Sequence, residues 1–425
     1  GTYTGSATAV TVTTGFKTDF VMIKRTNGTG SWNMIDALRG GDSRLYANAD
    51  SSETVEASDY ITFLATGFRV DITSNTDLNN TGDTFIYEAF AKNVASNTTL
   101  ENSFKTVIYS GNGSSQSIGG VGFQADLVWI KERSGTNPNV LYDSLRGAGK
   151  LITSGTDAAQ SGNAGDLMGA FETDGFQVNR NYLVHTAHDT TNGSASLDYV
   201  AWCWKAGGTW QSNASGSLSS TINVNTANGF SIVKYTGTGS TATYGHGLSA
   251  APEFIIIKKT SGTQNWNAGD DSTGWTKYFD FNTDGAAGTE TTVWNDTAPS
   301  STVVTLGGSN NTNANGEDYI MYCWHSVTEY SKIGTYAGTG GSFTVPCGFQ
   351  PDYVMIKRTD STGNWVIVDS VRDDGDDRLY ANNNVAEDTG QGETFKPTGF
   401  SPRTSTTNDT NTSGGTYIFM AFKMN

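Results

Sequence analysis

The chain has 425 residues, of which 42 are acidic and 26 are basic, and its formal net charge at pH 7 is −16. This balance argues against binding to nucleic acids and anionic membrane surfaces, which needs clusters of lysine and arginine that the sequence lacks. Charged residues make up 16% and aromatic residues 11%, with 51 glycines and 7 prolines, a composition typical of an all-β protein with many turns rather than of a disordered chain.

One phrase occurs four times along the chain and marks four similar segments. The first copy, "DFVMIKRTNGTGSW", begins at Asp19, and the others begin at Asp126, Glu253 and Asp352. A second phrase closes each segment, with copies that begin at Tyr87, Tyr199, Tyr319 and Tyr417. A period of roughly 100 residues indicates repeated units that are each large enough to bury a core.

The first repeat, residues 1–92, shows the strand pattern that the segments share. In "AVTVTTGF", residues 9–16, apolar and polar side chains alternate, as they do in a strand with one exposed face. In "FVMIK", which begins at Phe20, apolar side chains occupy both faces, which predicts a strand buried from both sides. A hairpin turn at Asn27 and Gly28 then leads into the returning strand "SWNMID". We predict about six or seven strands per repeat and an all-β fold of tandem β-sandwiches with jelly-roll-like or lectin-like wiring.

The other three repeats are predicted over residues 106–205, 231–327 and 331–425. Residues 93–105 join the first repeat to the second, and segment 206–230, rich in Gly, Ser and Asn, is the predicted linker before the third. The third repeat is divergent, because "GHGLSAAPEF" replaces the usual entry and an arginine that the others share is missing. The strand before "GTYAG" at Gly334 has no counterpart before "GTYTG" at Gly1, so we expect this chain to be the C-terminal part of a longer one.

Three stretches carry a resemblance to a known family. They are "NTANGFSIVKYTGTGSTATYGHGLSAAPEFIIIKK" (225–259), "YIMYCWHSVTEYSKIGTYAGTG" (319–340) and "CGFQPDYVMIKRTDSTGNWVIVDSVR" (347–372). They resemble a repeat domain of virion structural and tail-fibre-like proteins in marine tailed bacteriophages of the cyanophage type, over essentially the whole chain. The resemblance implies a place on the exterior of a phage particle, with other virion proteins as partners. It brings no catalytic residues and no cofactor. Because virion appendages are symmetric, we expect a homo-oligomer, and a trimer is the usual state of fibres.

An Asp-x-x-Arg element recurs in three repeats, as Asp36 and Arg39, Asp143 and Arg146, and Asp369 and Arg372. A carboxylate beside a guanidinium is able to grip a sugar or another ligand. The favoured interpretation is a structural ion pair that pins the turn after the second strand of the phrase, because a repeated fold repeats its internal braces.

Two segments carry part of a metal-binding pattern. "DFNTDG" places Asp280, Asn282 and Asp284 at alternate positions, like the first half of a calcium loop, but it lacks the glutamate at the twelfth position. His185 and His188 lie close together, yet zinc needs three or four ligands and no third candidate shares their spacing. We therefore predict no bound metal and no cofactor.

Recurring aromatic and sulfur side chains indicate core packing. Trp32, Trp266 and Trp365 share one position, and Trp202, Trp204 and Trp324 belong to the closing phrase. The cysteines Cys203, Cys323 and Cys347 are predicted to be small buried hydrophobes rather than a disulfide framework. Aromatic residues that do not recur are the better candidates for ligand binding, namely Trp210, Trp275, Tyr278 and Trp294.

No Gly-x-Ser-x-Gly elbow, Cys–His pairing or phosphate-binding glycine loop occurs in the sequence. The predicted function is that of a bacteriophage virion surface protein, as a fibre, spike or capsid decoration, with a role in host adhesion and without enzymatic activity. The alternative is a carbohydrate-binding module that recognises a host-surface glycan. A polysaccharide-degrading enzyme stays open as a third hypothesis, which requires a carboxylate pair about 5–10 Å apart in a cleft.

Overall fold

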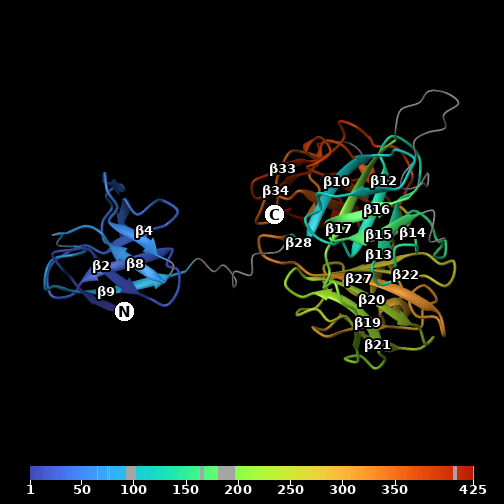
Figure 1. Ribbon diagram of the computed structural model, residues 1–425, viewed down its shortest axis with the longest axis horizontal. Helices are drawn as coiled ribbons and strands as arrows, with labels where there is room; N and C mark the ends of the chain where they lie inside the picture. Colours follow the sequence, from blue (N-terminus) through green and yellow to red (C-terminus); the bar gives the residue numbers. More distant parts are fainter. Residues whose placement is uncertain are drawn as a thin grey trace. The chain divides into compact units, whose positions relative to one another are not determined.

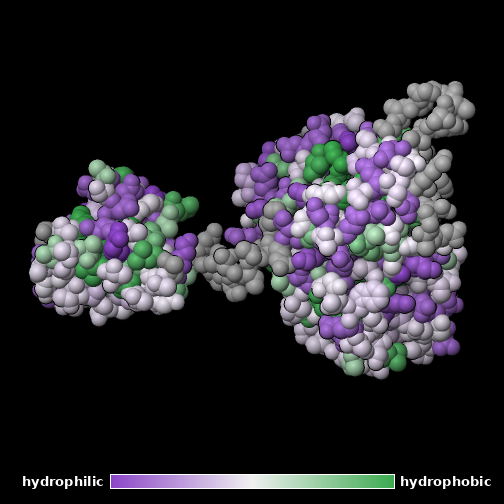
Figure 2. Space-filling model, in the orientation of Figure 1, coloured by the Kyte–Doolittle hydropathy of each residue, from purple (hydrophilic) through white to green (hydrophobic). Residues whose placement is uncertain are grey.

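A computed structural model describes residues 1–64, 66–73, 75, 77–91, 102–162, 167–179, 197–404 and 409–424. The chain forms two compact units, Gly1–Thr98 and Thr99–Asn425 (Figure 1). Of the residues that the structure describes, 43% lie in strands and 2% in helix, which confirms the all-β prediction. On the face drawn in Figure 2, hydrophobic residues form small separated patches among hydrophilic and near-neutral ones. No helix within the described ranges is long and apolar enough to cross a membrane.

The first repeat consists of two antiparallel sheets. The main sheet has the order β1-β9-β3-β4-β5-β6, and the smaller sheet has the order β2-β8-β7. The strands are β1 (Thr2–Thr4), β2 (Val10–Thr13), β3 (Phe20–Arg25), β4 (Asn33–Asp36), β5 (Ser43–Tyr46), β6 (Thr54–Val55), β7 (Ile61–Leu64), β8 (Gly67–Val70) and β9 (Thr84–Phe90).

The second repeat has a main sheet of order β10-β17-β12-β13-β14 and a smaller sheet of order β11-β16-β15. Its strands are β10 (Phe104–Ser110), β11 (Gln116–Ile118), β12 (Leu127–Glu132), β13 (Val140–Asp143), β14 (Ile152–Thr153), β15 (Met168–Glu172), β16 (Gly175–Val178) and β17 (Asp198–Trp204). Residues 93–101 of the predicted connection 93–105 lie outside the described ranges, and β10 begins earlier than the predicted start of this repeat at 106.

The third repeat has an eight-stranded main sheet of order β18-β19-β20-β27-β22-β23-β24-β25 and a two-stranded sheet of β21 and β26. Its elements are β18 (Gln211–Asn213), β19 (Ser220–Asn225), β20 (Phe230–Thr236), β21 (Ala242–Gly245), β22 (Phe254–Lys259), β23 (Asn267–Asp270), β24 (Lys277–Asp280), β25 (Gly288–Thr289), α1 (Thr291–Trp294), β26 (Val303–Leu306) and β27 (Asp318–Trp324).

The fourth repeat has a main sheet of order β28-β35-β30-β31-β32 and a smaller sheet of order β29-β34-β33. Its elements are β28 (Ser331–Ala337), β29 (Val345–Pro346), β30 (Tyr353–Arg358), β31 (Val366–Asp369), the 3-10 turn η1 (Asp373–Gly375), β32 (Leu379–Tyr380), β33 (Thr394–Lys396), β34 (Gly399–Ser401) and β35 (Thr416–Phe422).

The segment 206–230 is not the linker that its composition predicts. It contains β18 and β19, which extend the main sheet of the third repeat through pairing of β19 with β20. In "TINVN", Ile222 is 2% exposed and packs in the core of that repeat. The alternation of apolar and polar residues in this stretch therefore outweighs its Gly- and Ser-rich surroundings.

The four main sheets share one register between the repeated phrase and the closing phrase. The first residue of the phrase strand pairs with the last residue of the closing strand, as Phe20 with Phe90, Leu127 with Trp204, Phe254 with Trp324, and Tyr353 with Phe422. By this register Phe85, and not Tyr87, is the counterpart of Tyr199. The sequence alignment of the first closing phrase was thus wrong by two residues, which leaves each side chain on the same face of the sheet. The jelly-roll-like or lectin-like wiring stays a prediction.

Each repeat has its own core between its two sheets. In addition, the second, third and fourth repeats share one large core of 32 buried residues among those described, most of them from the main sheets, including Trp204, Trp324 and Phe422. The prediction of separate units with separate cores is therefore wrong for this part of the chain. The strands of the phrase in these three repeats are buried on both faces because one face meets the repeat's own small sheet and the other meets the shared core.

Candidate functional site

The shared core is organised by residues at equivalent positions of the three main sheets. Trp204, Trp324 and Phe422 each end a closing strand, and the ring of Trp204 lies edge-on to the other two, at centroid distances of 6.3 and 5.8 Å. Large aromatic side chains from three repeats thus meet at the centre of the shared core. The polar side chains around them form the seams between repeats.

The Asp-x-x-Arg element folds each arginine back onto its aspartate. Arg372 Nε donates to Asp369 Oδ2 at 2.6 Å, its backbone N–H donates to Asp369 Oδ1 at 3.1 Å, and its Nη2 donates to the carbonyl oxygen of Ile367 at 3.3 Å. The same ion pair joins Asp36 to Arg39 and Asp143 to Arg146. These pairs pin the turn after β31, β4 and β13, which confirms the structural interpretation.

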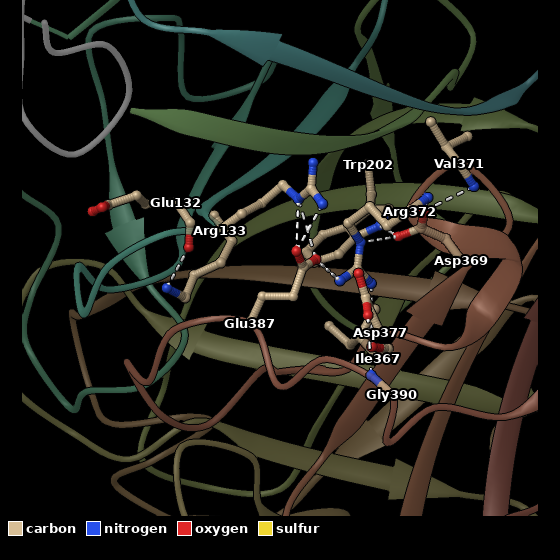
Figure 3. Close-up of polar contacts among 11 residues, drawn as sticks. Glu132, Arg133, Trp202, Ile367, Asp369, Val371, Arg372, Asp377, Glu387 and Gly390 are labelled. Atoms are coloured by element: carbon tan, nitrogen blue, oxygen red, sulfur yellow. Dashed lines mark hydrogen bonds and ion pairs between the residues drawn. The ribbon is translucent and has the colours of Figure 1, made fainter. Parts of the chain in front are cut away.

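In the second and fourth repeats this pair is buried and becomes part of a seam (Figure 3). The side chains of Asp369 and Arg372 are both 0% exposed. Trp202 of the second repeat donates its indole N–H to Asp369 Oδ2 at 2.9 Å, and Arg372 Nη1 donates to Glu387 Oε1 at 2.6 Å. Arg133 of the second repeat completes the network through bonds of 2.9 and 2.7 Å to Glu387 Oε2. Four charged side chains therefore satisfy one another where the two repeats meet.

The seam between the second and third repeats uses the same positions with different residues. Tyr322 occupies the position of Trp202 and donates its hydroxyl to Asp143 Oδ2 at 2.7 Å. Arg146 Nη2 in turn donates to the Tyr322 hydroxyl oxygen at 3.4 Å. Burial and the nearby Asp143 carboxylate raise the pKa of Tyr322 well above its ordinary value, so the phenol keeps its proton and remains a hydrogen-bond donor at neutral pH.

The seam between the third and fourth repeats lacks the arginine. Asp270 occupies the position of Asp143 and Asp369, and Met420 occupies that of Trp202 and Tyr322. Both line one small cavity together with Phe254 and Trp365. Asp270 accepts hydrogen bonds from the backbone N–H and the hydroxyl of Ser272, but burial still raises its pKa to about 6. At this seam the fourth repeat places the thioether of Met420 where Trp202 and Tyr322 carry a hydrogen-bond donor.

Three buried lysines link the repeats in a cycle. Lys357 Nζ donates to the carbonyl oxygens of Gly363 at 2.6 Å and of Asp284, in the third repeat, at 3.0 Å. Lys258 Nζ donates to Asp157 of the second repeat, and Lys131 Nζ to Asn384 of the fourth. All three lysines are 0% exposed, and burial lowers the pKa of each to about 8. Each repeat therefore inserts one cation into a loop of the next, and the third such contact returns to the first.

Backbone hydrogen bonds close the same three seams. The N–H groups of Gln160, Ala287 and Glu387 donate to the carbonyl oxygens of Thr260, Thr359 and Arg133, at 3.0, 3.0 and 2.8 Å. The acceptor in each case lies two residues after the buried lysine. The three repeats are thus related by a cyclic set of equivalent contacts, as subunits of a closed ring are.

The predicted ligand residues do not form one site. Trp294 is 0% exposed, and Trp275 is 5% exposed with its ring edge-on to Trp294 at 5.2 Å. The prediction that these two bind a ligand is wrong, because both pack in the core of the third repeat. Tyr278 is half-buried against the same core. Trp210 is 58% exposed, and its role in ligand binding stays a prediction.

The remaining sequence candidates have structural partners. Asn282 Oδ1 caps the N–H of Trp266 at 2.9 Å, and Asp284 presents its carbonyl oxygen to Lys357, so the "DFNTDG" loop serves a seam. No group of three or more metal-binding side chains occurs in the described ranges. His185 and His188 lie outside those ranges. The recurring tryptophans Trp266, Trp365, Trp202, Trp204 and Trp324 are buried, as predicted, whereas Trp32 of the first repeat is only half-buried. The three cysteines are buried and free.

Sequence reasoning missed the lysines at the seams. A lysine ends the apolar run of every copy of the phrase, at Lys24, Lys131, Lys258 and Lys357. A cation at a fixed place in a strand predicted to be buried on both faces is a signal for a buried partner, because an unpaired charge there is strongly unfavourable. The identity of that partner depends on the arrangement of the repeats.

A family model described as Domain of unknown function (DUF7483) matches residues 1–93 and 101–425 of the chain. Searches of curated proteins and of solved structures gave no match.

Proposed function

The chain belongs to this family of domains of unknown function, and we propose from its own structure that it is an architectural protein of the bacteriophage virion surface. The observation that carries the proposal is the use of its buried polar side chains. Lys357, Arg133 and Trp202 each bind a neighbouring repeat across a seam. Such chemistry gives a body of fixed shape rather than a reaction centre.

The resemblance of the sequence to repeat domains of marine phage virion proteins supports the same setting. In this proposal the chain is a fibre, spike or capsid decoration on the particle exterior, and its exposed loops contact other virion proteins or the host. A role as an enzyme is not proposed. The most deeply buried carboxylates, Asp143 and Asp369, are each bound to an arginine and closed off from solvent, which suits a brace and not attack on a polysaccharide.

The test is the location of the chain on intact particles of the phage that encodes it. We expect mass spectrometry of purified particles to detect the chain, and cryo-electron microscopy to show density of its shape on the exterior. Particles that lack the chain, or that carry it inside the capsid, would overturn the proposal.

A second candidate function is recognition of a host-surface glycan. It is favoured by the exposed ring of Trp210 and by a groove of about 480 Å³ between the third and fourth repeats, lined by Lys277, Thr335, Thr359 and Thr416 among others. Hydroxyl groups and an exposed aromatic ring are the usual means of binding sugars. Binding on a glycan array that is lost in a Trp210→Ala variant, and kept in a Trp210→Phe variant, would support it, and no binding by the unmodified chain would remove it.

A further inference from the structure

The first repeat has the same main-sheet face as the other three, but there the face is exposed. Phe90, at the position of Trp204, is 55% exposed, against 2% for the tryptophan. Ile86, at the position of Val200, is 37% exposed, against 0%. The burial pattern of β9 alternates between exposed and covered residues, whereas every residue after the first is buried in β17, β27 and β35.

The turn after β4 shows the same contrast. Leu38 lies between Asp36 and Arg39 and is 97% exposed, while Leu145, at the equivalent place in the second repeat, is 6% exposed in the shared core. A hollow of about 480 Å³ lies on this face and is lined by Phe20, Leu38 and Phe90 among others. A contiguous apolar surface of this kind in an acidic protein marks an interaction site.

The polar groups of the face hold the positions that they have at a formed seam. Lys24 Nζ donates to the carbonyl oxygen of Gly30 at 2.8 Å, as Lys357 does to Gly363. Asn48 caps the N–H of Trp32, as Asn282 and Asn382 cap the N–H groups of Trp266 and Trp365. In the larger unit, the residue two places after such an asparagine offers its carbonyl oxygen to the lysine of the next repeat. In the first repeat that residue is Asp50.

We infer that this face binds two further copies of the first repeat from other chains, so that three chains form a threefold ring with the geometry of the second, third and fourth repeats. The contacts within the larger unit identify the occupant. The ring in the larger unit is cyclic, so each member offers both a lysine and a receiving loop, and a closed ring of identical members satisfies all of them. The first repeat carries both elements, in Lys24 and in the loop that contains Asp50 and Glu53.

The ring assigns definite contacts. Lys24 Nζ of one copy binds the carbonyl oxygen of Asp50 in the next, and the Glu53 N–H donates to the Thr26 carbonyl oxygen, as Glu387 does to Arg133. The three Phe90 rings meet at the centre, as Trp204, Trp324 and Phe422 do. The inference concerns association of the chain itself and does not depend on the proposed place in a virion.

One residue makes this ring weaker than its intramolecular counterpart. Glu88 holds the position of Trp202, Tyr322 and Met420, and it is exposed on the same face. In the ring it lies against Asp36 and Arg39 of the adjacent copy, where Arg39 already binds Asp36 and Glu53. Glu88 would be the third carboxylate beside the single Arg39 guanidinium, after Asp36 and Glu53, and would leave excess negative charge in the ring. We therefore expect Glu88→Met, which introduces the residue of the fourth repeat, to strengthen association.

The first test is the mass of the whole chain in solution by light scattering or sedimentation at micromolar concentration. We expect three chains per particle, a shift to monomer for Leu38→Asp, and a higher trimer fraction on dilution for Glu88→Met. Thr11→Asp, on the outer sheet of the same repeat, is the control and leaves the trimer intact, since Thr11 is exposed on β2. A chain that stays monomeric at 100-fold higher concentration would overturn the inference.

A second measurement tests the geometry. In a Thr26→Cys, Glu53→Cys variant under mild oxidation we expect disulfide-linked species of up to three chains, because these positions correspond to the bonded pair Arg133 and Glu387. The native cysteines are buried and do not interfere. Far-ultraviolet circular dichroism of Leu38→Asp shows whether the variant is folded. A trimer that neither crosslinks at these positions nor responds to Leu38→Asp would show that the chains associate through another surface, which also overturns the inference.

Discussion

The indole nitrogen of Trp202 lies 2.9 Å from Asp369 Oδ2, although 167 residues separate them in the chain. The Arg372 guanidinium, which binds the same carboxylate oxygen, lies 5.6 Å from the centre of the Trp202 ring. One tryptophan of the second repeat therefore contacts both members of the ion pair of the fourth.

Trp202→Phe is expected to lower the free energy of unfolding of the larger unit by about 1–3 kcal/mol. The phenyl ring keeps the apolar contact, but the buried Asp369 carboxylate loses a donor that no water can replace at 0% exposure. Urea unfolding followed by far-ultraviolet circular dichroism measures the change. Trp210→Phe is the control, because Trp210 is exposed, and equal effects of the two variants would contradict the assignment.

Asp369→Asn is expected to destabilise the larger unit by about 3–5 kcal/mol, because it removes the charge opposite the buried Arg372 guanidinium and leaves Glu387 as its remaining ionic partner. Thermal unfolding monitored by calorimetry is the measurement. Glu317→Gln breaks the pair of Glu317 with Lys259 at the protein surface, and it is expected to leave the transition almost unchanged. A small loss for Asp369→Asn would mean that Trp202 and Glu387 hold the seam without the ion pair.

Asp270→Asn is expected to stabilise the larger unit at pH 7 and to have a much smaller effect at pH 4. Burial raises the pKa of Asp270 to about 6 in the folded protein. A raised pKa means that the folded state holds the proton more tightly, so stability is greatest below the unfolded value near 4 and is lost as the pH rises through 6. The asparagine removes that loss, which amounts to about 1–3 kcal/mol at neutral pH.

The measurement for Asp270→Asn is urea unfolding at several pH values between 4 and 7.5. Asp296→Asn is the control, because Asp296 is exposed and its φ of 48° suits asparagine as well as aspartate. A gain for Asp270→Asn that is independent of pH would show that ionisation of this carboxyl is not the cause.

Gly269→Ala is expected to destabilise the third repeat by about 1–3 kcal/mol through overpacking. A Cβ at this position would come within 2.6 Å of Trp275 and 2.7 Å of Trp294. Gly285→Ala, where the nearest atom is Thr283 Oγ1 at 3.4 Å, is the matched control. Equal stability of the two variants, measured by calorimetry, would contradict the packing of Trp275 and Trp294 against Gly269. Both tryptophans would then again be candidates for ligand binding.

The strands and their register follow from local pattern, whereas the assembly of the repeats does not. The phrase strand with Phe20 and Met22 on one face and Val21 and Ile23 on the other predicts burial from both sides, and it does so equally in all four repeats. The structure shows that the second face is covered by other repeats in three of them and only partly buried in the first. The pattern indicates that both faces of the strand are buried, but it does not indicate which part of the protein covers the second face.

The candidate site was predictable in part. The Asp-x-x-Arg brace follows from spacing and recurrence, because its members are three residues apart. The partners of that brace, Trp202 for Asp369 and Tyr322 for Asp143, lie 167 and 179 residues away, and no local pattern links them. Trp275 and Trp294 were misjudged for the opposite reason, since a residue that does not recur is able to fill a space that is itself peculiar to one repeat, here beside Gly269.

The cyclic seams have a consequence for how this protein is able to diverge. In a ring of identical subunits every substitution appears three times, so each seam must tolerate it. Here the three members are joined in one chain, and the seams already differ, with Trp202 facing Asp369, Tyr322 facing Asp143, and Met420 beside Asp270. The covalent joining of the three members in one chain thus releases each member from the constraint of symmetry. The three repeats are therefore able to keep the threefold arrangement of their shared core while their outer surfaces diverge. Each outer surface is then able to bind a different partner.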